Sequence, residues 1–284
     1  MKIKLLVDST CDLPIEYLHE NDITVIPLLV NFNEEEYQDL IELQAEGLYE
    51  LVDKKGMLPK TAARSVGVFL ETFKKYLNEG YDQVIFMGIS SKFSSTIDNA
   101  RMAAKEFPGK VYVHDTYNLS TGEGIQVVKA IKLLKEGKTC EEILWQLKEL
   151  APKIRSQFTV ENLEYLYKGG RCSQTSYYLG QGFKIKPIIR VVDGGMIVYK
   201  KVVGKINNAI NKMISMLKDD LDNLDLDVVM ITHSLADDAV KYAYDKLKEF
   251  IPEDKIMITR AGCVISSHCG RGTIGILYAL KENK

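Results

Sequence analysis

Short apolar runs alternate with helix-forming stretches through the first half of the chain, and this alternation limits the folds open to it. Runs rich in Val and Ile predict buried strands at residues 4–7, 23–30, 83–89 and 110–113. Between them, a short helix is expected to open at Pro14, and longer ones at 40–54, 66–77, 96–104, 124–135 and 140–154. Strands separated by helices need crossover connections. We therefore expect an N-terminal three-layer α/β/α domain with a mainly parallel sheet.

The second half of the chain has a different pattern. Two apolar runs, 184–192 and 196–203, flank Asp193-Gly194-Gly195, which strongly indicates a β-hairpin. Helices at 207–217 and 237–250, strands at 227–232 and 255–260, and a final apolar segment at 273–280 follow. This predicts a C-terminal two-layer α/β domain with a mixed sheet. Pro152 breaks the helical pattern, so we expect the boundary within 151–160 and domains at 1–155 and 156–284.

A cluster of hydroxyl side chains, Ser90-Ser91-Lys92-Phe93-Ser94-Ser95-Thr96, lies between the predicted strand 83–89 and the next helix. Ligands of open α/β sheets bind outside the carboxyl ends of the strands. A helix N-terminus also offers free N–H groups to an anion. The cluster therefore predicts an anion site. The alternative is a polar loop in which Ser94 or Ser95 caps the helix.

Three other segments carry candidate binding residues. Thr61 lies in an extended segment before a helix and can face a crevice. In Lys168-Gly169-Gly170-Arg171, one glycine is expected to cap a helix while Arg171 offers a planar fork of donors to an anion. His268 lies among serines and glycines in an expected loop at 266–273, which favours a ligand contact over a purely structural histidine.

Asp8 follows the first strand, the position of an aspartyl nucleophile in some phosphatases. That chemistry normally needs a second acid two residues later, where this chain has Thr10. We therefore expect Asp8 and Ser9 to hydrogen-bond loop amides. A Ser–His hydrolase of acyl esters is the other catalytic alternative, using His268 and a loop serine. The chain has no Gly-x-Ser-x-Gly elbow, and no acid is evident as the third member of a triad.

Composition narrows the cellular setting. The formal net charge of −2 does not favour nucleic-acid binding. No apolar run is long enough for a membrane span, and the apolar part of the N-terminal run is too short for a signal peptide. The five cysteines, Cys172 among them, are scattered without a CxxC pair, which favours the cytoplasm and argues against disulfides or a zinc site. Cations outnumber acids between residues 153 and 212, which indicates either a solvated face or a surface for an anionic ligand or acidic partner.

Several short segments, in this order and spacing, resemble the DegV family of bacterial fatty-acid-binding proteins. The resemblance runs over nearly the whole chain and is carried by Asp8-Ser9-Thr10-Cys11-Asp12-Leu13-Pro14, Pro27-Leu28, Pro59-Lys60-Thr61, Ser90-Ser91-Lys92-Phe93-Ser94, Leu163 to Arg171, Lys186-Pro187-Ile188 and His268-Cys269-Gly270. It implies two α/β domains with a long-chain fatty acid in a tunnel between them. The hydroxyls of Thr61, Ser91 and Ser94 would hold the carboxylate, with His268 and Arg171 close by.

The resemblance also implies a carrier that performs no chemistry alone and needs no cofactor or metal. Some members are the binding subunit of a fatty-acid kinase and present the carboxylate to an ATP-using partner. The chain has Thr61-Ala62-Ala63-Arg64-Ser65 where the family commonly has Thr-Ser-Gln-Pro-Ser, and it has Ser95 and Arg271 where glycine and proline are usual. These changes are expected at the mouth of the site. Val203 stands where an arginine linked to kinase partnering is common.

Overall fold

The computed structural model describes residues 1–161, 163–171 and 185–281, so Cys172 and Lys184 lie outside the described residues. The first sheet is parallel throughout, in the order β2-β1-β6-β7. Its strands are β1 (Ile3–Asp8), β2 (Thr24–Ile26), β6 (Gln83–Gly88) and β7 (Val111–Asp115). Val84 to Met87 are fully buried, because helices cover both faces of the sheet.

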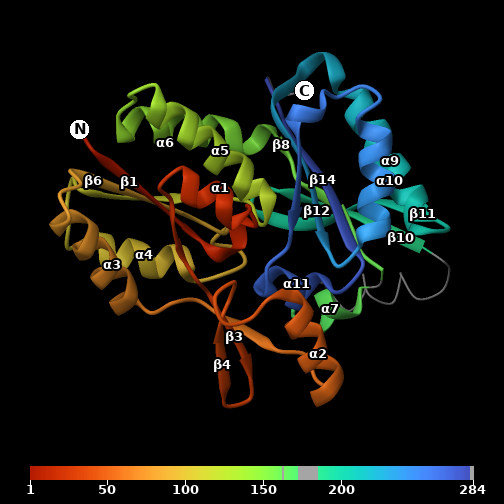
Figure 1. The fold of residues 1–284 in the computed structure, drawn as a ribbon, viewed down its shortest axis with the longest axis horizontal. Helices are drawn as coiled ribbons and strands as arrows, with labels where there is room; N and C mark the ends of the chain where they lie inside the picture. Colours follow the sequence, from red (N-terminus) through yellow and green to blue (C-terminus); the bar gives the residue numbers. More distant parts are fainter. Residues whose placement is uncertain (162, 172–184, 282–284) are drawn as a thin grey trace.

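Helices form the outer layers around this sheet (Figure 1). One face packs against α1 (Ile15–Glu20), α5 (Thr121–Lys135) and α6 (Cys140–Leu150). The other face packs against α3 (Val66–Asn78) and α4 (Thr96–Ala104). The predicted three-layer α/β/α arrangement is confirmed.

The second sheet is mixed and has the order β11-β10-β9-β14-β12-β13, with β8 also paired to β14. Its strands are β8 (Ile154–Arg155), β9 (Gln157–Thr159), β10 (Ile185–Val192), β11 (Gly195–Val203), β12 (Leu224–Ser234), β13 (Ile256–Arg260) and β14 (Thr273–Leu280). Helices α9 (Ile206–Asp219) and α10 (Asp237–Leu247) cover one face. The predicted mixed sheet is confirmed. Its other face also packs against a helix, α5 of the first half of the chain.

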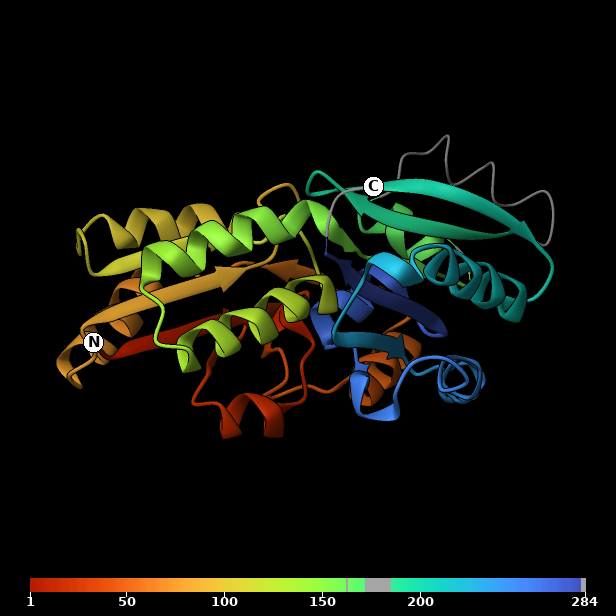
Figure 2. The ribbon, with the colours of Figure 1, turned by 90° about the horizontal axis from the view of Figure 1, so that it is seen from above.

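Helix α5 joins the two sheets. Its residues Ile125 and Val127 share one hydrophobic cluster with Met87 of β6 and with Met230 and Leu277 of the second sheet. Figure 2 shows α5 and α6 lying along the first sheet. Helix α5 begins beside the second sheet, where Thr121 contacts Thr232, and α6 leads back to that sheet. The chain itself enters the second sheet at β8. The predicted division at residues 155 and 156 stays a prediction.

A small antiparallel sheet, β4-β3-β5, was not foreseen. It consists of β3 (Leu29–Phe32), β4 (Glu35–Gln38) and β5 (Lys60–Ala62), and packs with α2 (Ala45–Lys55) and α11 (Cys263–Cys269). The single strand predicted at 23–30 is wrong. It breaks at Pro27 into β2 and β3, which belong to different sheets. Proline has no N–H to donate to a strand ladder, so the chain changes direction there.

Other boundaries also differ from the sequence prediction. The helix expected at 40–54 begins only at Ala45, because Leu40 is left-handed with φ 66° and the residue before the helix, Gln44, is extended with φ −109° and ψ 164°. The loop expected at 266–273 is partly helical, since α11 runs to Cys269 and ends at Gly270, whose φ is 81°. Helix α6 ends at Leu150. The helix expected to end at Gly169 or Gly170 is α7 (Glu164–Lys168). One-turn 3-10 segments occur at η1 (Ser9–Cys11), η2 (Ala151–Lys153), η3 (Leu221–Asn223) and η4 (Glu253–Lys255).

The predicted β-hairpin is confirmed. Strands β10 and β11 pair antiparallel, with Val192 opposite Gly195. Asp193 and Gly194 form the turn with φ of 48° and 76°. Two left-handed residues make a type I′ turn, whose twist matches that of the strands.

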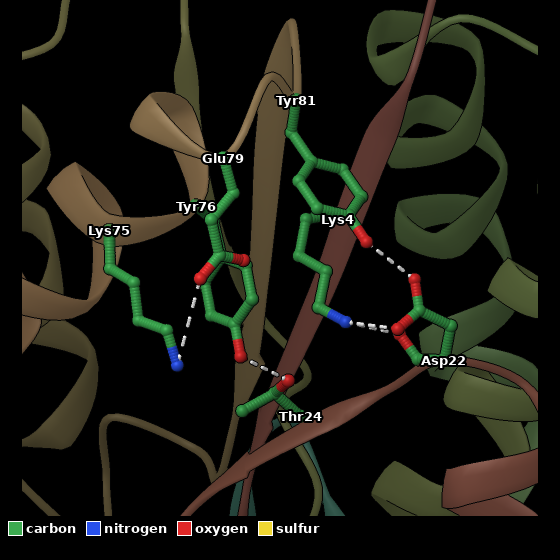
Figure 3. A network of polar contacts seen from close by, with 7 residues as sticks. All are labelled: Lys4, Asp22, Thr24, Lys75, Tyr76, Glu79 and Tyr81. Atoms are coloured by element: carbon green, nitrogen blue, oxygen red, sulfur yellow. Dashed lines mark hydrogen bonds and ion pairs between the residues drawn. The ribbon is translucent and has the colours of Figure 1, made fainter.

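At the amino end of the parallel strands of the first sheet, a polar network joins β1 to α3 and to the residues before β2 and β6 (Figure 3). The Lys4 ammonium lies 2.6 Å from Oδ1 of Asp22, although the Lys4 side chain is only 4% exposed. Tyr81 donates its hydroxyl hydrogen bond to Oδ2 of the same carboxylate at 2.7 Å. Tyr76 and Thr24 share a hydrogen bond of 2.6 Å. The Asp22 carboxylate neutralises the buried positive charge of Lys4 on the first strand.

Candidate functional site

A cavity of about 410 Å3 lies where the carboxyl end of the parallel sheet meets the mixed sheet and α11. Its volume falls within the range of about 300 to 1,000 Å3 that is usual for small-molecule sites. Much of its wall is apolar, including Leu28, Ile89, Phe93, Leu119, Phe158, Leu166, Val264 and Leu277. Polar side chains from four separate segments gather at part of this wall: Thr61, Ser94, Ser95, Arg171 and His268.

Thr61 and His268 are the most directly connected pair in the cavity. Oγ1 of Thr61 lies 2.8 Å from Nε2 of His268, although 207 residues separate them in the sequence. Thr61 is presented by β5, where it pairs with Val30, and His268 by the last turn of α11. Burial, together with the nearby Arg171 cation, lowers the pKa of His268 to about 4. The imidazole is therefore neutral at physiological pH and carries one N–H.

The two glycines before Arg171 have different roles. Gly170 is the left-handed residue, with φ 72°, and no atom lies within 4 Å of where its Cβ would be. Gly169 has an ordinary helical conformation with φ −76°. A Cβ at Gly169 would overlap Nδ1 of His268 and would lie 2.9 Å from the carbonyl oxygen of Tyr165. Gly169 therefore makes room for the imidazole.

Arg171 connects α7 to the hydroxyl cluster. Its guanidinium donates to the carbonyl oxygen of Gly169 at 2.6 Å and to that of Phe93 at 2.9 Å. The side chain also lines the cavity, while the residue as a whole is exposed. A cation held at the rim can balance an anion inside the cavity without occupying it.

The hydroxyl cluster divides into residues that line the cavity and residues that do not. Ser94 and Ser95 line it. Oγ of Ser94 lies 2.8 Å from Oγ1 of Thr96 and accepts the Thr96 N–H at 3.2 Å, whereas Ser95, at the N-cap of α4, makes no side-chain capping bond. The anion-site and capping interpretations are therefore compatible at Ser94.

The first two serines of the cluster lie elsewhere. Ser90 is buried and donates its hydroxyl hydrogen bond to the carbonyl oxygen of Gly194 at 2.8 Å, which holds the turn of the β10–β11 hairpin. Ser91 is not among the residues that line the cavity, and its backbone N–H points to the Asp115 carboxylate at 3.3 Å. Ser91 is therefore the one predicted carboxylate ligand that does not line the cavity.

The structural role predicted for Asp8 and Ser9 is confirmed. The Asp8 carboxylate accepts the backbone N–H groups of Thr10 at 2.8 Å and Ile89 at 2.9 Å. Oγ of Ser9 accepts the N–H of Leu28 at 3.1 Å. Burial raises the pKa of Asp8, and it raises the pKa of the neighbouring Asp39 to about 6. These contacts fasten the loop after β1 to the cavity wall.

The sequence differences from the family pattern lie in different places. Ala62, Ala63 and Ser95 line the cavity, but neither Arg64 nor Arg271 is among the lining residues. Arg271 lies 3.6 Å from the Asp53 carboxylate and 4.9 Å from the centre of the Tyr49 ring. Val203 ends β11 with 69% of its surface exposed. The changes at positions 62, 63 and 95 therefore reach the cavity itself, whereas those at 64 and 271 do not.

Sequence reasoning missed a second polar group in the cavity wall. It consists of Ser120, Ser156, Thr232, His233, Ser234 and Thr273. Oγ of Ser156 is buried and has no hydrogen-bond partner among the described residues. Cys269 also lines the cavity, and burial raises the pKa of its thiol to about 12. These residues come from strand ends, from the N-cap of α5 and from the short helix α11, and they carry no motif that would have distinguished them.

Within the described ranges, no helix is long and apolar enough to cross a bilayer. The same residues contain no group of three or more His, Cys, Asp or Glu side chains placed to hold a metal ion. The cysteines that the structure describes, Cys11, Cys140, Cys263 and Cys269, are all free and buried.

Comparison with known proteins gives a consistent result. The family model described as "Uncharacterised protein, DegV family" matches residues 2–281. A protein of Thermotoga maritima named fatty acid-binding protein is 33% identical over 288 residues, and the match covers 100% of both chains.

Solved structures share the fold over the whole chain. A DegV family protein from Thermus thermophilus, whose structure is described by its fatty acid binding, has a TM-score of 0.91 and 30% sequence identity, covering 99% of this chain and 100% of that one. DegV of Bacillus subtilis, described as a fatty acid binding protein, has a TM-score of 0.87 and 28% identity, with coverage of 99% and 100%.

Proposed function

Because this chain belongs to the DegV family, we propose that it binds a long-chain fatty acid in the cavity described above. The observation that carries the proposal is the Thr61–His268 pair, a polar contact of 2.8 Å at the edge of a largely apolar cavity. An amphiphile with one anionic head group and an apolar chain matches that division. The relatives described as fatty-acid-binding proteins support the same ligand class.

The apolar wall can supply most of the binding free energy. Burial of a C16 chain contributes about 0.8 kcal/mol per CH2 group, or roughly 10 kcal/mol before the costs of association. Side chains such as Leu119, Phe158 and Leu277 would contact the chain. We propose that the chain extends from the rim inward between the two sheets, as a tunnel would hold it.

The head group is the more demanding part, since a buried carboxylate needs charge-assisted hydrogen bonds. We propose that Thr61 and Ser94 donate their hydroxyl hydrogen bonds to it. If Nε2 of the neutral His268 carries the imidazole proton, it donates to Thr61 and leaves the Thr61 hydroxyl free to donate to the carboxylate. Arg171 would balance the charge from the rim. Ser91, which lies outside the cavity lining, has no part in this arrangement.

We also propose that the protein acts as a carrier subunit for an ATP-dependent fatty-acid kinase, without catalysing a reaction alone. A cradle of hydroxyls leaves the carboxylate oxygens accessible to a phosphoryl donor, which a bidentate arginine clamp would obstruct. Val203 presents an exposed apolar side chain at the position where the resemblance leads us to expect an arginine linked to this partnership, and we propose that the partner surface of this chain differs there. The expected compartment of such a carrier is the cytoplasm.

The hydrolase alternative needs an oriented base. In the described residues, Nδ1 of His268 is buried without a hydrogen-bond partner, so no acid orients the imidazole. The lowered pKa further weakens His268 as a general base. Turnover of acyl esters that disappears in His268→Ala would favour this alternative over the carrier.

Mass spectrometry of the organic extract from purified protein tests the proposed ligand. We expect one fatty acid per chain, drawn from the lipid pool of the expression host. An extract without fatty acid, from protein that also fails to take up added palmitate, would contradict the proposal. Acyl-phosphate formation with a cognate ATP-binding subunit tests the carrier role separately.

A further inference from the structure

A second hollow, of about 730 Å3, is lined by the β10–β11 hairpin turn and shares no lining residue with the cavity. It is bounded by the end of β7, the end of α6, and strands β8, β10 and β11. We call it the basic groove, after the cations that line it: Lys92, Arg101, Lys148, Arg155 and Arg190. Figure 2 shows the hairpin turn pointing toward the first sheet, which brings these elements together.

The charge of the groove is only partly neutralised. Arg101 lies 3.6 Å from Asp98, and Arg155 lies 4.0 Å from Asp220. Across the described part of the chain, Lys92, Lys148 and Arg190 have no ion-pair partner.

The groove contains two carboxylates and one histidine. Asp115 accepts the backbone N–H of Tyr117 at 3.0 Å, and Asp193 lies in the exposed hairpin turn. Burial lowers the pKa of His114, which therefore adds no positive charge at neutral pH. The excess of cations is suited to an anion with several negative groups.

The groove also presents aromatic surface. The rings of Tyr117 and Tyr199 belong to residues that are 47% and 38% exposed. The Arg190 guanidinium lies over the Tyr199 ring, 3.7 Å from its centre, and donates a hydrogen bond to Oε1 of Gln157 at 2.7 Å. Its Nε is buried and has no hydrogen-bond partner in the described residues.

We propose that the basic groove binds a nucleotide that carries two or more phosphates. The guanidinium and ammonium groups would hold the phosphates, because arginine forks match phosphate oxygens. A tyrosine ring would stack on the base. The combination of unpaired cations, exposed rings and a volume within the small-molecule range favours a nucleotide over an acidic protein segment. This inference goes beyond fatty-acid binding and does not depend on it.

Isothermal titration of the full chain, as purified, with ATP, adenosine and inorganic tripolyphosphate tests the proposal. We expect ATP to bind, with an affinity that falls as salt is added. Tripolyphosphate should bind about tenfold more weakly than ATP, because it lacks the stacking base. Lys148→Glu and Tyr199→Leu should each weaken ATP binding by about tenfold. The control Lys105→Glu makes the same charge change on an exposed residue outside the groove and should leave ATP binding unchanged.

Several outcomes would overturn the proposal. Absence of ATP binding at millimolar concentration is one, and equal affinity for tripolyphosphate and ATP is another. Tighter binding of a polyglutamate peptide than of ATP would identify a protein-docking surface instead. If Lys148→Glu fails to fold, Lys148→Gln provides the same test with a smaller charge change. The bound fatty acid, measured in the same variants, should be unchanged, so failure of this site is distinguishable from failure of the lipid site.

Discussion

Gly169 lies so close to His268 that any side chain at position 169 would overlap Nδ1 of the imidazole. The glycine has a helical backbone conformation that any residue can adopt. Its lack of a side chain is therefore required by the histidine and not by the backbone. Gly170 shows the reverse, with a left-handed φ of 72° and open space around it.

This pair predicts different effects for two alanine substitutions. Gly169→Ala should displace the imidazole, break its contact with Thr61 and weaken fatty-acid binding by about tenfold, as expected for one lost hydrogen bond to a charged network. Gly170→Ala should cost roughly 1 kcal/mol of stability through its left-handed backbone and leave binding intact. Fluorescent fatty-acid displacement and urea unfolding measure the two effects. Equal loss of affinity in both variants would show that the imidazole contact is not what matters.

Removal of the hydroxyls predicted to hold the head group should empty the cavity without unfolding the protein. Thr61→Ala combined with Ser94→Ala deletes two donors to a buried carboxylate, and each should cost about tenfold or more in affinity. Mass spectrometry of the extracted lipid measures the result. Ser65→Ala is the matched control, because Ser65 is exposed, makes no capping bond and lies outside the cavity. An unchanged lipid content in the double variant would refute the assignment of the head-group site.

The lowered pKa of His268 predicts a pH-dependent contribution to stability. The imidazole has a pKa of about 4 in the folded protein, whereas an unfolded histidine titrates near pH 6.5. Between these values the unfolded state binds the proton and the folded state does not. Stability from this residue is therefore fully present above pH 6.5 and is lost progressively as the pH falls toward 4.

Urea unfolding of ligand-free wild type and His268→Gln, from pH 7 to pH 4, measures this effect. The difference in unfolding free energy should shift in favour of the variant as the pH falls. The comparison with the variant removes the opposite contribution of buried carboxylates with raised pKa values, such as Asp39. Parallel pH profiles for the two proteins would argue against a buried neutral imidazole.

The Lys4–Asp22 pair predicts an asymmetry between its two partners (Figure 3). The Lys4 side chain is 4% exposed and that of Asp22 is 71% exposed. Position 22 has a left-handed backbone conformation with φ 54°, which asparagine adopts as readily as aspartate. Asp22→Asn therefore preserves the backbone but leaves the buried Lys4 ammonium without its charge partner. It should cost about 1 to 2 kcal/mol. Lys4→Met replaces the buried stem and returns Asp22 to water, so it should cost less. Thermal and urea unfolding decide the order, and a larger loss in Lys4→Met would contradict this account.

The architecture could be predicted because hydrophobic period and turn chemistry are local. The run at 83–89 corresponds to strand β6, and the two runs around Asp193-Gly194 form the β10–β11 hairpin. Both could be predicted, because a buried parallel strand and a type I′ turn each require particular residue types over a few consecutive positions. The strand predicted at 23–30 was wrong, although Pro27 is a local signal that a strand should end there. Helix α11 could not be found this way, because Ser266, Ser267 and His268 have the composition of a loop and are held helical by burial against β3, β5 and α2.

The site was only half predictable. Residue types suited to a carboxylate could be identified at Thr61, Ser94, Arg171 and His268, and the structure brings these side chains to one cavity. Nothing local separates Ser91 from Ser94, because which hydroxyl faces the cavity depends on the path of the backbone around the turn. The apolar residues that line the cavity could not be predicted for a similar reason. In the sequence, Leu119 and Phe158 cannot be distinguished from ordinary core residues, because only the packing of the whole chain leaves a cavity beside them.

The sequence by itself determined the family, the two kinds of sheet and the chemical character of the head-group residues, because each depends on residue type over short spans. Only the tertiary structure decided that Thr61 meets His268 across 207 residues, that Gly169 leaves room for the imidazole, and that the hairpin turn lines the basic groove and not the cavity. Distances between remote segments follow from how helices and sheets pack, and packing is a property of the whole chain.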